Sequence, residues 1–219
     1  MKVSTIHKAY IELFSDFAQK TGLHLSKSSG DLTLKRPEFT ARFVLLKTVY
    51  DDIWLYPVLF IEYKSLARLA KVFFPNRPHF LDAVRINLFT LRDFLLEKYD
   101  GRRSNNRYFT IRSEEDIASF GKAYLELVQM ALSYIDGHCS SIAELNTMYN
   151  SNPYWKENPH CSWYYDNCFL GPAVAKLSNN SNYESLRDIY VEIIENGDVM
   201  PDHEMKDAFY KMIAILDSM

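Results

Sequence analysis

The sequence predicts an α+β fold, with an antiparallel sheet in the N-terminal half and an all-helical C-terminal half. Strand-like segments, with apolar residues at alternate positions, dominate between about residues 30 and 112. From residue 113 onward apolar residues recur every three or four positions, which is typical of helices with one buried face. This segregation of strands and helices argues against an alternating βαβ pattern and a parallel sheet.

The longest helix signal covers residues 113–135. Ser113 is a favourable N-cap, and the acidic residues at 114–116 occupy the first turn, where backbone N–H groups favour negative charge. Asp136-Gly137 predicts the end of the helix. The expected buried face consists of Ile117, Phe120, Tyr124, Leu127, Val128, Ala131 and Ile135.

The N-terminal half begins with an amphipathic helix over residues 4–21. Its expected buried face consists of Ile6, Tyr10, Leu13, Phe14 and Phe17. A long hairpin follows at about residues 39–63, with Asp51-Asp52 as its turn. Pro57 has no N–H to donate, so it predicts an edge position or a bulge. We also expect strands at 32–35, 84–88 and 107–112 and a helix at 90–99, while residues 64–76 fit a helix or a strand.

The C-terminal half contains two predicted capping boxes, Ser141 with Glu144 and Ser181 with Glu184. They open helices over 141–149 and 181–195. A short helix is predicted over 170–177, with Pro172 in its first turn. The last helix begins at Pro201, and residues 150–169 are expected to be irregular.

The chain is expected to form a single compact domain, 1–219, because no Ser/Gly/Pro-rich linker interrupts it. A subdivision into a strand-rich half, 1–112, and a helical half, 113–219, stays open. The net charge of -3 argues against a protein built mainly to hold nucleic acid.

Three cysteines do not suggest a disulfide framework and indicate a reducing compartment. The N-terminus lacks the pattern of a signal peptide, and the most apolar run, near residues 53–61, is about half the length that spans a bilayer. We therefore expect a cytoplasmic protein without membrane contact.

Histidines and cysteines of the C-terminal half are the types of residue that bind zinc. They are His138-Cys139, His160-Cys161 and Cys168. Their spacing matches no CxxC pattern, and no residue of evident role orients a Cys/His pair for nucleophilic catalysis. We expect no metal, no cofactor and no catalytic residue.

Two groups of residues are candidates for partner binding. The aromatic segment 153–169 carries rings of the kind that anchor protein interfaces, although they can equally cover the helical core. An acidic face is the second group, although a turn and a helix N-terminus also explain its residues. The candidates are Trp155, Trp163, Tyr164, Tyr165, Asp51, Asp52, Glu114 and Glu115.

The order of these elements resembles a known group of proteins. A strand passes into a capped helix at TIRSEEDIASFGKAYLELV, and SSIAELNTMY and FLGPAVAKLSNNSNYESLRDIYVEIIE follow. This order is similar to that of bacterial proteins of unknown function, some of which look like immunity proteins of polymorphic-toxin and type VI secretion systems. The resemblance implies a cytosolic, non-enzymatic protein that binds a toxin and occludes its active site.

Two alternatives stay open. One is an enzyme with a site between the two halves, involving His160 and Asp166. The other is a regulator that contacts nucleic acid through Arg102, Arg103 and Arg107, since arginines interleaved with aromatic residues are typical of such surfaces.

Overall fold

The computed structural model describes residues 3–49, 52–73, 83–97, 108–154, 164–196 and 203–219. The chain divides into two compact units, each made of two stretches of sequence. Unit 1 contains residues 1–61 and 86–133, and unit 2 contains residues 62–85 and 134–219. None of the three boundaries, after residues 61, 85 and 133, coincides with the one considered at residue 112, because most of the long helix that follows it belongs with the sheet.

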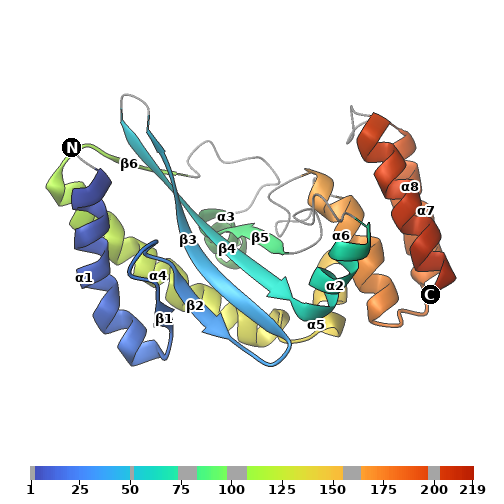
Figure 1. Ribbon diagram of the computed structural model, residues 1–219, viewed down its shortest axis with the longest axis horizontal. Coiled ribbons are helices and arrows are strands. Elements are labelled where there is room, and N and C mark those ends of the chain that lie inside the picture. Colours follow the sequence, from blue (N-terminus) through green and yellow to red (C-terminus); the bar gives the residue numbers. More distant parts are fainter. Residues whose placement is uncertain (1–2, 50–51, 74–82, 98–107, 155–163, 197–202) are drawn as a thin grey trace. The chain divides into compact units, whose positions relative to one another are not determined.

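The antiparallel sheet confirms the predicted α+β class (Figure 1). Its strand order is β1-β2-β3-β4-β5, and β6 also pairs with β4. The long predicted hairpin is formed by β3 and β4, which have 11 residues each. The strands are β1 (His24–Leu25), β2 (Leu32–Lys35), β3 (Phe39–Val49), β4 (Ile53–Tyr63), β5 (Val84–Asn87) and β6 (Phe109–Ile111).

Alternation along the hairpin separates a core face from an opposite face. Phe43 and Leu55 are fully buried on the core face, whereas Trp54 and Tyr56 on the opposite face are half-buried. Pro57 is buried in β4, which has β3 on one side and β5 and β6 on the other, so the edge prediction is wrong. Pro57 comes two residues after Leu55, the last residue that pairs with β6.

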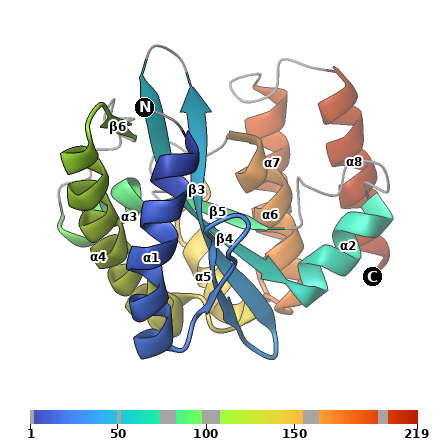
Figure 2. The same ribbon diagram turned by 60° about the vertical axis from the view of Figure 1, so that its left-hand side comes forward.

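Two helices, α1 (Val3–Thr21) and α4 (Glu114–His138), lie side by side against the core face (Figure 2). Their contact is aromatic: the rings of Phe14 and Tyr124 lie 5.1 Å apart, and Phe120 reaches Phe109 of β6 at 4.5 Å. Gly121 permits the close approach, because a Cβ there would lie 3.2 Å from Cε1 of Tyr10 and would overlap Leu13.

The helix α4 continues to His138, past the end predicted at Asp136-Gly137. Gly137 is exposed and does not adopt the left-handed conformation of a terminating glycine. The helix α3 (Leu88–Leu95) begins two residues before its predicted start, because Asn87 Oδ1 accepts from the N–H groups of Phe89 and Thr90.

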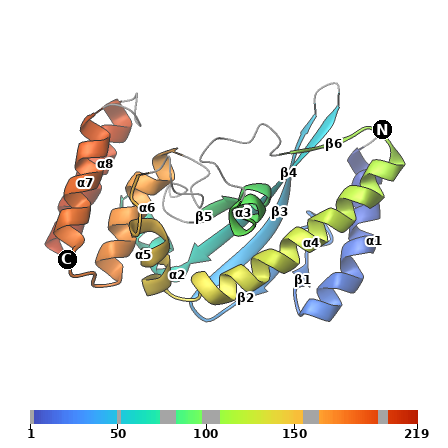
Figure 3. The ribbon, with the colours of Figure 1, turned by 180° about the vertical axis from the view of Figure 1, so that it is seen from behind.

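Unit 2 is mostly helical (Figure 3). Its helix α6 begins at Tyr164, so Pro172 lies inside the helix and not in its first turn, contrary to the prediction. The capping box at Ser181 does not form, because Asn182 holds the N-cap position without a side-chain bond. The helices are α2 (Lys64–Phe73), α5 (Ile142–Asn150), α6 (Tyr164–Leu177), α7 (Tyr183–Glu195) and α8 (His203–Ser218).

The predicted N-cap of α5 is confirmed, since Ser141 Oγ accepts from the N–H of Glu144 at 3.2 Å. The Glu144 carboxylate also accepts from the N–H and the hydroxyl of Ser140 at 2.7 Å each. These bonds hold the pKa of Glu144 below its usual value.

A network of half-buried side-chain amides and a buried tyrosine joins α5, α6 and α7. Tyr190 is fully buried, and its hydroxyl donates to Asn150 Oδ1 at 3.0 Å. The Asn150 amide donates in turn to the Gly171 carbonyl at 3.0 Å and to Asn146 at 2.8 Å. Tyr190 is therefore held in place both by packing and by a hydrogen bond from its hydroxyl.

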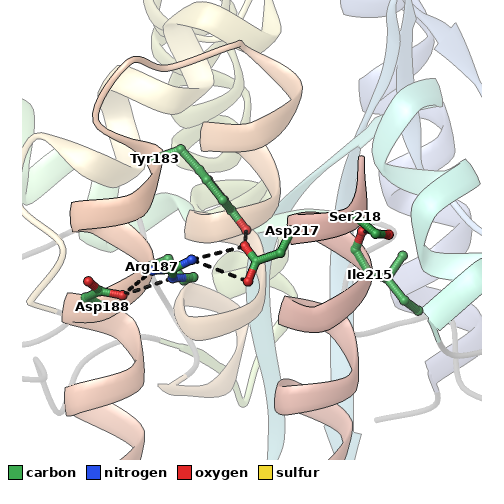
Figure 4. A network of polar contacts seen from close by, with 6 residues as sticks. All are labelled: Tyr183, Arg187, Asp188, Ile215, Asp217 and Ser218. Carbon is green, nitrogen blue, oxygen red and sulfur yellow. Dashed lines mark hydrogen bonds and ion pairs between the residues drawn. The ribbon is translucent and has the colours of Figure 1, made fainter.

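A second network joins the start of α7 to the end of α8 (Figure 4). The Tyr183 hydroxyl donates to Asp217 at 2.9 Å, and Arg187 pairs with Asp217 at 3.4 Å and with Asp188 at 2.8 Å. Burial and the Asp217 carboxylate raise the pKa of Tyr183, so its hydroxyl stays a donor. Exposed ion pairs of this kind add little stability.

Candidate binding site

Strand pairing brings acidic residues from distant parts of the sequence to one corner of unit 1. Ile53 of β4 pairs with Ile111 of β6, which places Asp52 beside Arg112. The Arg112 Nε donates to Asp52 Oδ2 at 3.1 Å, although the two residues are 60 positions apart. The helix α4 starts two residues later, so exposed Glu114 and Glu115 follow directly. We call Asp52, Glu114 and Glu115 the acidic corner.

Asp116 explains why α4 starts at this point. Its Oδ2 accepts from the backbone N–H groups of Arg112 and Ser113 at 2.9 Å each, and its own N–H donates to Ser113 Oγ at 3.2 Å. These two backbone bonds hold the pKa of Asp116 below its usual value. The predicted cap at Ser113 is thus confirmed, and Asp116 is committed to the helix start while Glu114 and Glu115 face outward.

A groove runs between α1 and α4, next to the acidic corner. Its volume is about 500 Å³, and its walls are mainly apolar, with Leu13 38% exposed. The groove extends along α4 from Glu114 to Lys122, a distance of about 12 Å at the helical rise of ~1.5 Å per residue. Because Glu114 belongs to both features, the groove and the acidic corner form one continuous surface. The lining residues are Thr5, Ala9, Tyr10, Leu13, Glu114, Ile117, Ala118 and Lys122.

The Tyr10 hydroxyl is a buried donor in the wall of this groove. Tyr10 is 2% exposed, and among the described residues its hydroxyl has no hydrogen-bond partner. Burial, together with the nearby Asp116 charge, raises its pKa and keeps it neutral. A buried hydroxyl left without a partner costs about 1–3 kcal/mol.

The cysteines described by the structure have the properties of core residues. Cys139 and Cys168 are buried, and burial raises the pKa of each thiol to about 12, which disfavours a nucleophilic thiolate. Cys139 contacts Met148, with 3.8 Å between the sulfur atoms, and its carbonyl accepts from the Tyr63 hydroxyl. Within the described ranges no group of three or more His, Cys, Asp or Glu side chains could hold a metal ion.

Several predicted site residues lie outside the described part of the chain. These are Asp51, Trp155, Trp163, His160, Cys161, Arg102, Arg103 and Arg107. Tyr164, Tyr165 and Asp166 belong to the first turn of α6, and their side chains also lie outside the described part. Of the eight residues predicted to bind a partner, the structure thus brings together three.

Apart from Glu114, none of the groove residues was predicted to belong to a site. The helical period assigned Leu13 to the buried face of α1, and Thr5, Ala9, Ala118 and Lys122 carried no signal of their own. An aromatic cluster was also missed: the Tyr108 ring stacks on Trp54 at 4.6 Å and lies 5.4 Å from Tyr56. The alternation of aromatic residues on the non-core face of β4 was the available signal for this cluster.

No family model, curated protein or solved structure matches this chain. Among the described helices, none combines the length and the apolar character needed to cross a bilayer.

Proposed function

We propose that this chain is a protein-binding protein that receives a basic segment of a partner protein on the acidic corner and in the groove between α1 and α4. The observation that carries the proposal is the position of Glu114, which belongs both to the acidic corner and to the lining of the apolar groove. Protein interfaces commonly combine such an apolar anchor site with a charged rim.

The resemblance of the element order to immunity proteins suggests the biological role. In this proposal the chain is a cytoplasmic immunity protein, and its partner is a toxin whose active site it occludes. A toxin that acts on nucleic acid has a basic cleft, and acidic residues of an inhibitor complement such a cleft and accelerate association by electrostatic steering. No catalytic step is assigned to the chain.

Charge reversal in the acidic corner tests the proposal. The tagged protein and its E114K/E115K variant are purified from the natural host, and the retained proteins are identified by mass spectrometry. We expect the wild type to retain one protein in stoichiometric amount and to release it at high salt. The variant should lose at least about nine-tenths of the retained protein. A close charge pair contributes more than 1.4 kcal/mol to binding, which is a factor of about ten in affinity.

The control is E184K/E192K, which reverses two exposed charges on α7 and has the same net charge. Glu184 occupies a first helical turn, as Glu114 and Glu115 do, so both variants lose helix-terminus charge. Equal retention by both variants, or a partner whose binding does not change with salt, would contradict the proposal.

A further inference from the structure

The strand β3 is much longer than its neighbour β2. The four residues of β2 pair only with Thr40–Phe43, from Lys35 opposite Thr40 to Leu32 opposite Phe43. On its other side, β3 is hydrogen-bonded to β4. In the part of the chain that the structure describes, no strand therefore pairs with the outer edge of β3 from Val44 to Val49 (Figure 2).

The backbone groups that point outward along this edge follow from the ladder. Arg36 N–H donates to the Phe39 carbonyl at 2.9 Å, so Phe39 is a hydrogen-bonded position toward β2. In an antiparallel pair such positions alternate. The N–H and C=O groups of Leu45, Lys47 and Val49 thus point to the outer edge, and no backbone bond from the described loops and turns reaches them.

Two side chains along this edge are apolar and exposed, and the other four are half-buried. Leu46 is 45% exposed and Val49 is 58% exposed. Open sheet edges with apolar residues are pairing templates, and proteins normally cover or charge them. Here Lys47 is the one charged side chain between Val44 and Val49.

We propose that the edge Val44–Val49 is a strand-addition site for an extended segment of another protein. A row of alternating N–H and C=O groups is complemented by a polypeptide backbone in the extended conformation, which selects this class of ligand. The segment carries apolar residues on the side of Leu46. This site is separate from the groove and does not depend on the function proposed above.

A second copy of the chain fits this edge poorly. Antiparallel pairing centred on Leu46 would place Val49 of one copy opposite Phe43 of the other, where Leu32 already pairs. Pairing centred on Lys47 would place two ammonium groups opposite each other, which is unfavourable. Two copies could thus pair at most over residues 44–48, whereas a separate segment can pair with the whole edge from Val44 to Val49, so the ligand is assigned to a different protein.

The test uses the peptide VTVEVTV, acetylated and amidated, and two N-methylated forms of it. Its Thr and Glu residues lie opposite Leu45, Lys47 and Val49, so their N–H groups point toward β3. We expect saturable shifts of the Leu45, Lys47 and Val49 amide signals in NMR spectra of the full chain. Methylation of the Thr and Glu nitrogens should weaken binding at least about tenfold, as expected for the loss of several hydrogen bonds, whereas methylation of the Val nitrogens should not.

Two protein variants complete the test. Lys47→Pro removes an outward N–H without removing a bond to β4, and should weaken peptide binding as strongly as the Thr/Glu methylation does. Lys47→Ala keeps the N–H and should retain most of the binding. Absence of shifts along Val44–Val49 at millimolar peptide, or equal binding of both methylated peptides, overturns the proposal even if Lys47→Pro does not fold.

Discussion

Replacing Gly171 by alanine is expected to lower the free energy of unfolding by about 3 kcal/mol. A Cβ at this position would overlap the hydroxyl and ring of Tyr190. Overpacking of this kind costs about 1–3 kcal/mol, and displacement of the ring also breaks the bond to Asn150, which adds about 1 kcal/mol. Tyr190 has no space to move into without disturbing α5 and α7, because it is fully buried.

Urea denaturation followed by circular dichroism measures this effect. Gly137→Ala is the matched control, since Gly137 is helical and nothing lies within 4 Å of the added methyl group. In a helix this change should stabilise the protein by up to ~1 kcal/mol. If both variants unfold at the wild-type urea concentration, the packing of Tyr190 against Gly171 is not as described.

The Ala118→Trp substitution is expected to reduce the affinity for the partner protein about 100-fold, equivalent to ~2.7 kcal/mol. Ala118 is exposed and lines the groove of about 500 Å³, so an indole ring there would fill part of the space into which the partner's apolar side chain is proposed to enter. A blocked anchor site at the centre of an interface has an effect of this size.

The comparison uses the partner identified with the wild type and titration calorimetry of the purified proteins. Ala214→Trp on α8 is the control, because Ala214 is also exposed and helical but does not line the groove. Both variants should unfold like the wild type. If the Ala118→Trp variant binds the partner as tightly as the wild type does, while E114K/E115K shows the expected loss of affinity, then the acidic residues bind the partner and the groove does not.

Much of the fold follows from local patterns of sequence. The period-two alternation of Phe39, Ala41 and Phe43 and of Ile53, Leu55 and Leu59 specifies two strands whose shared apolar face must be buried. Ser113 and the acidic turn after it specify the start of α4. Local pattern did not determine where α6 begins, because residues 164–169 have the aromatic composition of a loop but contribute the buried Cys168 and Phe169 to unit 2.

The candidate site was only partly predictable. Asp52 and Glu114 were both singled out as acidic, but their proximity depends on the β4–β6 register, which the sequence does not contain. The groove depends on a helix–helix contact in which Gly121 lets α1 approach while Leu13 stays partly exposed. Such a contact is a tertiary property, and the helical period of α1 alone assigned Leu13 to the core.

The most direct test of the proposed function is photo-crosslinking from the groove itself. A benzophenone amino acid is introduced in place of Lys122, which lines the groove, or in place of Glu192, an exposed residue of α7. The complex with the co-purified partner is then irradiated. We expect a covalent adduct with the partner from position 122 and none from position 192. An intact complex that crosslinks from position 192 and not from position 122 would contradict it.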